Sequence, residues 1–154
     1  MGQDLKLTIW GKPIAQARPK FFTRKSKSGK VFAGAFNPQE TEAGRFANAV
    51  ANQLPAGFVP FDGPLEISAR FVMPIPASAS KKAREGMITG ETAHTKKPDA
   101  SNMLKFIEDC LNGVVWVDDS LICRFVDVEK VYGAHPRTEI EVRSFGGSHG
   151  ESKI

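Results

Sequence analysis

The stretch KPDASNMLKFIEDCLNGVVWVDDS, residues 97–120, decides the fold that this sequence predicts. Apolar residues at helical spacing predict a helix over about 101–111, and the Asn-Gly pair that follows is typical of a helix end. The short apolar run 114–117 predicts a strand that ends at the acidic pair Asp118-Asp119. A helix, a tight turn and a returning strand are expected to bring Asp119 back beside Asp99, which lies just before the helix.

The rest of the sequence predicts one domain with a single sheet. Alternating apolar and polar residues predict strands over about 5–10, 65–73, 121–131 and 138–143. A capped amphipathic helix is expected after Asn37, and a short basic helix over 80–86. We therefore predict a mixed α+β (α/β) fold class with one small sheet packed by two main helices. The domain is expected over residues 1–144, with a flexible tail over 145–154.

The bulk composition is that of an ordinary globular protein. Hydrophobic residues make up 41% and charged residues 25% of the 154 positions, and no apolar run approaches the ~20 residues that cross a bilayer. The N-terminus lacks the basic and apolar pattern of a secretory signal, so we expect a cytoplasmic location without membrane contact. Cys110 and Cys123 have no metal-type spacing, and we expect both to be reduced, buried thiols.

The distribution of charge indicates a polyanionic partner. The net charge is only +4, but seven basic residues and no acid lie between Lys12 and Lys30. Two smaller basic groups follow, at residues 81–84 and 96–97, whereas acids crowd into residues 99–129. A basic surface with an acidic spot inside it is what a metal-dependent nuclease needs, because basic side chains hold phosphates and carboxylates hold the metal.

Residues 23–34 form a segment rich in Lys, Ser and Gly that is typical of a mobile loop or of the tip of a hairpin. One interpretation is a solvated loop without function. The other is an arm that grips DNA, since basic side chains on a flexible segment adapt to the path of a backbone. The candidate DNA-binding residues of this and the other basic groups are Arg18, Lys20, Arg24, Lys25, Lys27, Lys30, Lys81, Lys82, Lys96 and Lys97.

The charged side chains around the predicted 101–111 helix are the candidates for chemistry. Ser101 and Lys105 lie four residues apart, on one face of that helix, and Asp109 continues the face. Magnesium prefers oxygen ligands, usually one or two carboxylates completed by water and phosphate, and a lysine one turn away can meet developing charge. Simpler interpretations stay open: Asp99 as a helix cap, the acidic pair as a turn, and Asp109 as a surface partner of Lys105.

The ordered motifs of this region resemble the RusA family of Holliday junction resolvases. The matching segments are KPDASNMLK at 97–105, EDCLNG at 108–113 and VVWVDDSLI at 114–122. The family pattern is a PDxDN start, a lysine three residues after the asparagine, a DxLNG turn and a closing DDSxI. Weaker similarity in the N-terminal basic segment, the middle and the last strand extends the resemblance over nearly the whole chain.

The resemblance implies a homodimer of mixed α/β subunits that binds four-way junctions and makes paired nicks with Mg²⁺, for which Mn²⁺ can substitute. By position, Asp99 matches the family's first metal aspartate, and Asp119, with Asp118 beside it, matches the later acidic pair. Lys105 matches the catalytic lysine. Two symmetric sites fit a two-fold substrate, because each subunit can cut one strand. A role in recombination and repair, in a bacterial, phage or prophage context, is implied as well.

One position departs from the family pattern, since Ser101 stands where the second aspartate is expected. A hydroxyl lacks the charge of a carboxylate, so weaker ligation of the metal is expected at this position. The alternatives are an active natural variant in which Asp118 or a water fills the gap, a disarmed site, or a different register of the carboxylates. Two alternatives to junction resolution therefore stay open. One is a nuclease for flaps or forks, and the other is a junction-binding protein without catalysis.

Three further residues carry weaker expectations. Asn102 is expected to be structural, bonding backbone groups at the helix start and holding Asp99 in place. Trp116 is expected in the core or at a dimer interface, with stacking on an opened base as the alternative. His94 is expected to be exposed in a loop, where a contact with phosphate is the functional alternative.

Overall fold

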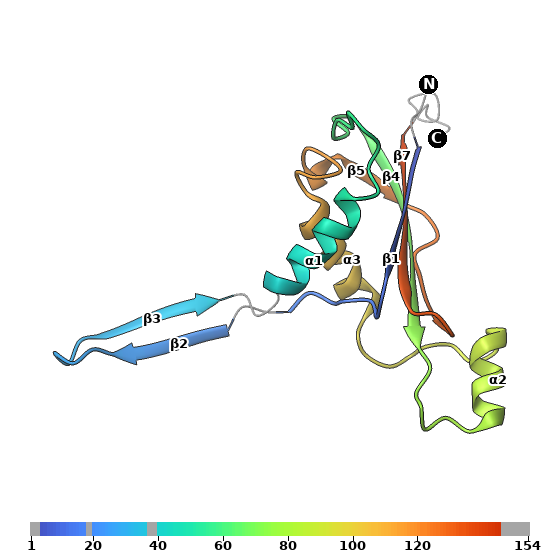
Figure 1. Ribbon diagram of the computed structural model, residues 1–154, viewed down its shortest axis with the longest axis horizontal. Coiled ribbons are helices and arrows are strands. Elements are labelled where there is room, and N and C mark those ends of the chain that lie inside the picture. The colour runs from blue at the N-terminus through green and yellow to red at the C-terminus, as the bar shows by residue number, and fades with distance from the viewer. Residues whose placement is uncertain (1–3, 18–19, 37–39, 146–154) are drawn as a thin grey trace, which may run out of the picture.

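The computed structural model describes residues 4–17, 20–36 and 40–145, so the cap predicted at Asn37 and the tail from residue 146 on lie outside it. In chain order its elements are β1 (Asp4–Trp10), β2 (Lys20–Lys25), β3 (Val31–Phe36), α1 (Glu40–Ala51), β4 (Leu65–Pro74), α2 (Lys81–Thr89), α3 (Ala100–Leu111), the 3-10 turn η1 (Asp119–Leu121), β5 (Ile122–Phe125), β6 (Glu129–Gly133) and β7 (Arg137–Ser144). Figure 1 shows α1 and α3 on one face of the main sheet, with the β2–β3 hairpin projecting away and α2 beyond the end of β4. Within the described ranges, the helices are all too short or too polar to cross a membrane.

The main sheet confirms the predicted mixed α+β class. Its five strands have the order β1-β7-β4, and both β5 and β6 pair with β4 on the remaining side. β7 runs antiparallel to β1 and β4, whereas β5 and β6 run parallel to β4. The strands predicted over 5–10, 65–73 and 138–143 are confirmed as β1, β4 and β7, because their side chains alternate between a buried and a more exposed face.

The single long strand predicted after the acidic pair is wrong, because the chain forms β5 and β6, which pair with different halves of β4. Ile67 of β4 pairs with Phe125, and Arg70 of β4 pairs with Glu129. The chain from Phe125 to Glu129 is therefore one residue longer than the stretch of β4 that it faces. Asp127 lies in this gap in a left-handed conformation, with φ of 56°. The apolar residues on either side of Asp127 hid the break in the sequence pattern.

The strand predicted over 114–117 is also wrong, because this segment is a compact turn. The backbone N–H of Gly113 donates to the Trp116 carbonyl at 2.7 Å, and that of Val115 donates to the Leu111 carbonyl at 2.9 Å. Trp116 is fully buried, at 0% exposure, which confirms its predicted place in the core and contradicts base stacking. A short apolar run has the same appearance in a buried turn and in a buried strand, so periodicity did not distinguish them.

The hydrophobic core lies between the main sheet and the helices α1 and α3. Inward side chains of β1, β4 and β7 include Leu7, Phe71 and Val142, each at 1% exposure or less. They meet Phe46 of α1 and Phe106 of α3, whose rings contact edge to face with 5.4 Å between centroids. Full burial of a side chain of this size contributes about 1.5–3 kcal/mol, so this packing fixes α3 against the sheet.

β1 is an edge strand, and the side chain of Gln53 occupies part of its free edge. Gln53 Oε1 accepts the Thr8 N–H at 2.9 Å, and Gln53 Nε2 donates to the Thr8 carbonyl at 2.7 Å. The same Nε2 donates to the Ala49 carbonyl in α1 at 3.1 Å. An amide paired in this way blunts an edge that would otherwise recruit another strand, and it ties the end of α1 to the sheet.

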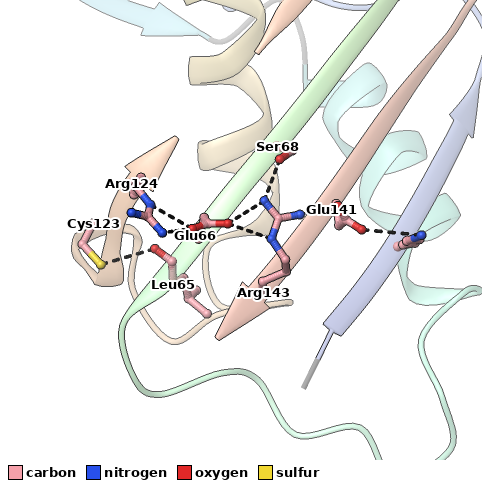
Figure 2. Close-up of polar contacts among 8 residues, drawn as sticks. Leu65, Glu66, Ser68, Cys123, Arg124, Glu141 and Arg143 are labelled. Atoms are coloured by element: carbon pink, nitrogen blue, oxygen red, sulfur yellow. Dashed lines mark hydrogen bonds and ion pairs between the residues drawn. The ribbon is translucent and has the colours of Figure 1, made fainter. Parts of the chain in front are cut away.

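The sheet face opposite α1 and α3 carries a row of ion pairs centred on Glu66 (Figure 2). Glu66 accepts hydrogen bonds from Arg124 Nε and Arg143 Nε, each at 2.8 Å, and Arg143 also donates to Ser68 Oγ. Arg143 pairs in addition with Glu141, its neighbour on β7. Hydrogen bonds from Arg124 and then Arg143 lower the pKa of Glu66, so the charges of this face are mutually satisfied.

Both cysteines are free thiols, as expected, but neither is fully buried as predicted. Cys123 is exposed on β5, where its Sγ lies 3.4 Å from the Leu65 carbonyl. Cys110 is half-buried on α3, and burial raises the pKa of its thiol to about 11. The difference follows from position, since β5 lies at the margin of the sheet and α3 lies over its centre.

Candidate active site

Asp99 occupies the N-cap position of α3 but does not cap the helix with its side chain. Its backbone is extended, with φ of −72° and ψ of 142°, and its carboxylate makes no capping hydrogen bond. The Asp99 carbonyl accepts the backbone N–H groups of Asn102 and Met103, both at 3.1 Å. Aspartate at this position normally accepts a bond from a first-turn N–H. A helix-cap role therefore does not account for this exposed carboxylate.

Asp99 lines an open pocket of about 500 Å³ at the start of α3, which we call the Asp99 pocket. Lys97 and Asn102 flank Asp99 in the pocket wall, Lys12 comes from the segment after β1, and Glu42 comes from α1. Two ammonium groups beside carboxylates provide a surface for a phosphate together with a divalent cation.

Ser101, Lys105 and Asp109 follow one another at four-residue spacing along an exposed face of α3, as predicted. Lys105 Nζ lies 3.3 Å from Asp109 Oδ1, and the two side chains are 55% and 42% exposed. The interpretation of Asp109 as a surface partner of Lys105 is therefore confirmed. Exposed pairs of this kind add little to stability, so this one orients the lysine more than it stabilises the helix.

Glu108 and Asp119 add negative charge around Lys105. The hydrogen bond from Lys105 to Asp109 raises the pKa of Lys105, and the charges of Glu108 and Asp119 raise it further. Burial raises the pKa of Glu108, the charge of Lys105 lowers it, and Asp119 and Asp109 raise it. Sequence reasoning missed Glu108 as a site residue. Its place three residues after Lys105, on the same helix face, is the signal that identifies it.

The two residues of the acidic pair differ in their contacts. Asp118 is exposed and its Oδ2 accepts the Ser120 N–H at 3.0 Å, which lowers the pKa of Asp118. The turn interpretation is thus confirmed for Asp118. Asp119 begins η1 and is half-buried. Of the two, Asp119 is the carboxylate that lies within electrostatic reach of the middle of α3.

The carboxylates near α3 fall into two groups, one at the Asp99 pocket and one around Lys105. Asp119 is not among the described residues that line the Asp99 pocket. In the described part of the chain, no three His, Cys, Asp or Glu side chains gather closely enough to hold a metal ion. Mg²⁺ needs only one or two carboxylates when water and phosphate complete its shell. The donor set therefore fits a Mg²⁺ site that the substrate completes, and does not fit a closed cage of carboxylates.

Of the two predictions for residues 23–34, a mobile loop or the tip of a hairpin, the structure confirms the hairpin. β2 and β3 pair antiparallel over their full lengths of six residues each. The turn between them is closed by the Ser26 N–H, which donates to the Lys30 carbonyl at 2.7 Å. At the root of the hairpin, the Gln16 N–H donates to the Asn102 carbonyl at 3.0 Å. The hairpin therefore begins beside the Asp99 pocket.

The basic side chains predicted to bind DNA lie on three segments. The exposed ones are Lys25, Lys27 and Lys30 on the hairpin, Lys81 and Lys82 on α2, and Lys96 and Lys97 before α3. Arg18 and the side chains of Lys20 and Arg24 lie outside the described part of the chain. Figure 1 shows the hairpin, the loop before α3 and α2 all toward the end of the molecule where β4 ends. Basic side chains thus lie on the projecting hairpin, on α2 and on the loop before α3, all at this end of the molecule.

His94, which was expected to be exposed, is half-buried against β6. Its ring centroid lies 4.6 Å from that of Tyr132. Burial, and then the charge of Lys130, lowers the pKa of His94. A neutral ring packed on a tyrosine is poorly suited to hold phosphate, so this residue belongs to the packing of the loop before α3.

Hard oxygen donors within a basic surface are typical of enzymes that cut DNA with a metal ion. The class is that of the DNA endonucleases, and within it the chain belongs to the RusA family. The family model, described as endodeoxyribonuclease RusA, matches residues 11–143. A relative from Bacillus subtilis (strain 168), the uncharacterized protein YqaN, is 32% identical over 142 residues, which cover 90% of this chain and 95% of that protein. The resemblance seen in the motifs is therefore confirmed over most of the chain.

Proposed function

We propose that this protein is a Mg²⁺-dependent endonuclease that resolves four-way DNA junctions by paired, symmetric nicks in recombination and repair. The observation that carries the proposal is the Asp99 carboxylate, which lies at the N-cap of α3 without capping the helix and lines a pocket with Lys12 and Lys97. A carboxylate in this position suits a cation, and the neighbouring ammonium groups suit a phosphate. Family membership supports nuclease activity, and the junction as substrate is the finer part of the proposal.

Asp99 and Asp119 are the proposed metal ligands, with Asp118, the Ser101 hydroxyl or water as further oxygens. When bound, Mg²⁺, or Mn²⁺ in its place, supplies a Lewis acid and a water of lowered pKa. Lys105 lies six residues after Asp99, about 9 Å along the helix axis. A DNA backbone that lies on this exposed face therefore contacts both the Asp99 pocket and the group around Lys105.

Lys105 is the proposed catalytic cation. The hydrogen bond to Asp109 raises the pKa of Lys105, which favours the charged ammonium form. A fixed positive charge on this face meets the negative charge that develops on the phosphate or on the leaving oxygen. Asp109, at 3.3 Å, restricts the positions that the ammonium group explores.

A homodimer is the proposed assembly, because a four-way junction has two-fold symmetry and each subunit can then cut one strand. The DNA substrate and the bacterial relative support a cytoplasmic site of action. The proposed DNA contacts are Arg18, Lys20, Arg24, Lys25, Lys27, Lys30, Lys81, Lys82, Lys96 and Lys97.

Synthetic substrates of matched sequence separate this proposal from its rivals. Symmetric nicking of a four-way junction that requires Mg²⁺ supports junction resolution. Cutting confined to flaps or forks supports a nuclease for other branched DNA. Junction binding without nicking at any concentration of Mg²⁺ or Mn²⁺ contradicts both enzyme proposals and supports a junction-binding protein.

Ser101→Asp tests whether the missing carboxylate limits catalysis. Ser101 is exposed on α3, so an aspartate fits there without repacking. Because the variant adds a negative ligand, we expect half-maximal nicking at an about 10-fold lower Mg²⁺ concentration. Ser101→Asn, which is similar in size but neutral, is the control and is expected to resemble the wild type. An aspartate variant with the wild-type Mg²⁺ requirement contradicts a metal-binding role for this position.

A further inference from the structure

The segment that leads into Asp99 runs past β6 on its way to α3. Residues 95–97 are exposed, and residue 98 is followed directly by Asp99. Lys130 of β6 reaches this segment, where its Nζ donates to the Lys96 carbonyl at 2.7 Å and to the Pro98 carbonyl at 2.9 Å. Among the described residues, Lys130 is the one whose side chain hydrogen-bonds to the backbone of residues 95–98.

The sheet places Lys130 for this contact. Lys130 pairs with Phe71 in the register of β4 and β6, and Phe71 faces the core between the sheet and the helices. The Lys130 side chain therefore leaves the sheet on the side of α3. Tyr132, two residues further along the strand, lies on the same side and packs against the His94 ring. Together, these two β6 side chains hold both ends of the segment before Asp99.

The two hydrogen bonds of Lys130 are charge-assisted, and the lysine is half-buried, which strengthens them. The Pro98 carbonyl belongs to the peptide group that carries the Asp99 N–H. A bond that holds this carbonyl fixes the peptide plane from which the Asp99 side chain departs. A rotation of that plane would turn the carboxylate away from the Asp99 pocket.

We propose that Lys130 is a positioning residue, which holds the peptide group before Asp99 so that the carboxylate is directed into the Asp99 pocket before a metal binds. The inference rests on the proposed function, because it takes Asp99 as a metal ligand. Lys130 itself contacts the backbone and not the metal. Groups that orient a metal ligand in this way typically account for about 10–100-fold in metal affinity.

Lys130→Met tests this role, because it keeps the aliphatic stem and removes both hydrogen bonds. Lys6→Met is the matched control, since Lys6 is 80% exposed, lies 3.6 Å from Glu141 on the other face of the sheet and has no part in the site. We expect Mn²⁺ binding to protein without DNA, measured by electron paramagnetic resonance, to weaken about 10-fold in the Lys130 variant alone. Backbone amides of residues 96, 97 and 99–102 are expected to exchange faster with deuterium in that variant alone.

Junction nicking gives a third measurement. In Lys130→Met, the Mg²⁺ concentration for half-maximal nicking is expected to rise about 10-fold, while the rate at saturating Mg²⁺ stays within about twofold of the wild type. A higher Mg²⁺ requirement with a nearly unchanged maximal rate indicates a loss of metal affinity, whereas a general loss of active protein would lower the maximal rate. Lys130→Arg keeps charged donors and is expected to recover part of the metal affinity.

Wild-type Mn²⁺ affinity in Lys130→Met overturns the proposal, even if the amides exchange faster. The two hydrogen bonds of Lys130 would then have no effect on metal binding by the Asp99 carboxylate. If that variant does not fold, Lys130→Gln replaces it, and unchanged Mn²⁺ affinity there overturns the proposal as well. A wild-type protein that binds Mn²⁺ but cuts no DNA contradicts the proposed nuclease function alone. The Mn²⁺ and exchange measurements remain decisive for Lys130, because neither depends on cleavage.

Discussion

The start and the middle of α3 present opposite electrostatic surroundings to a DNA backbone. At the start, the Asp99 carboxylate lies in a pocket with the two lysines Lys12 and Lys97. In the middle, the Lys105 ammonium lies 3.3 Å from Asp109 and within reach of two further carboxylates. A carboxylate among cations suits a metal that is bound together with phosphate, whereas a cation among carboxylates stays charged and oriented. We therefore propose that Asp99 binds the metal at the start of the helix and that Lys105 stabilises charge in its middle, with Asp119 as the proposed metal ligand nearer to Lys105.

The largest expected effect comes from Asp99→Asn, which removes the carboxylate and keeps the size of the side chain. Nicking should fall more than about 100-fold, because loss of even an outer-shell group costs ~10–100-fold. Junction affinity should stay the same or rise, since repulsion with phosphate falls. Asp119→Asn is expected to behave in the same way, and Asp62→Asn, in the exposed link before β4, is the control. Gel-shift and nicking assays measure both quantities, and loss of junction binding in Asp99→Asn counts against a metal role.

Lys105→Ala is expected to have the next largest effect. Removal of a charge that stabilises the transition state typically lowers the rate about 100-fold. The fold should be unchanged, because the side chain is 55% exposed. Asp109→Asn keeps the lysine and removes its partner, so only a small loss of rate is expected. Single-turnover nicking, with circular dichroism as the folding check, separates the two variants, and equal rates in Lys105→Ala and the wild type would argue against catalysis by this lysine.

The β2–β3 hairpin differs from both ends of this comparison, because it carries basic side chains and none of the proposed metal ligands. Replacement of Lys25, Lys27 and Lys30 by Gln should weaken junction binding and reduce the salt-dependence slope by up to about 3, at ~0.9 per phosphate contact. The nicking rate of bound junction should be preserved, because both groups on α3 are intact. Lys6→Gln is the control for charge alone. A slope equal to that of the wild type means that the hairpin does not contact DNA.

The smallest expected effect concerns Glu108 and pH. Burial raises the pKa of Glu108 above its usual 4.5, so the folded protein holds this proton more tightly than the unfolded chain does. The protonated form of Glu108 therefore adds to the free energy of unfolding below its usual pKa. This contribution is lost as pH rises from the usual pKa through the raised pKa of the folded protein. Glu108→Gln should therefore lose less stability than the wild type as pH rises above 4.5. Urea denaturation at a series of pH values measures this difference, and parallel curves for the two proteins contradict it.

Local sequence patterns predicted the elements that bury one face. Buried and more exposed residues alternate over most of β1, β4 and β7, and α3 has apolar residues at helical spacing. Each of these patterns fits only one kind of secondary structure. The shared face of Ser101 and Lys105 followed directly from the helix. The carboxylate of Asp99 was also found from its sequence position, but its lack of a capping bond depends on the path of the chain before it.

The structural features that local sequence patterns did not predict depend on contacts between segments that are distant in the sequence. The 114–117 segment is apolar because Trp116 fills the core, and this burial distinguishes a turn from a strand only in three dimensions. The extra residue at Asp127 becomes visible only when the pairing with β4 is known. The contact of Lys130 with the Pro98 carbonyl likewise joins parts of the chain that no local pattern connects.

The central claim is that Asp99 provides a metal-binding carboxylate in a junction-resolving nuclease. Nicking of a synthetic four-way junction by the wild type and by Asp99→Asn, at increasing Mg²⁺ concentration, tests it most directly. We predict paired, symmetric nicks by the wild type that require Mg²⁺, no nicks by the variant, and junction binding by both. Wild-type nicking by Asp99→Asn, or nicking of the junction without a divalent cation, would contradict the claim.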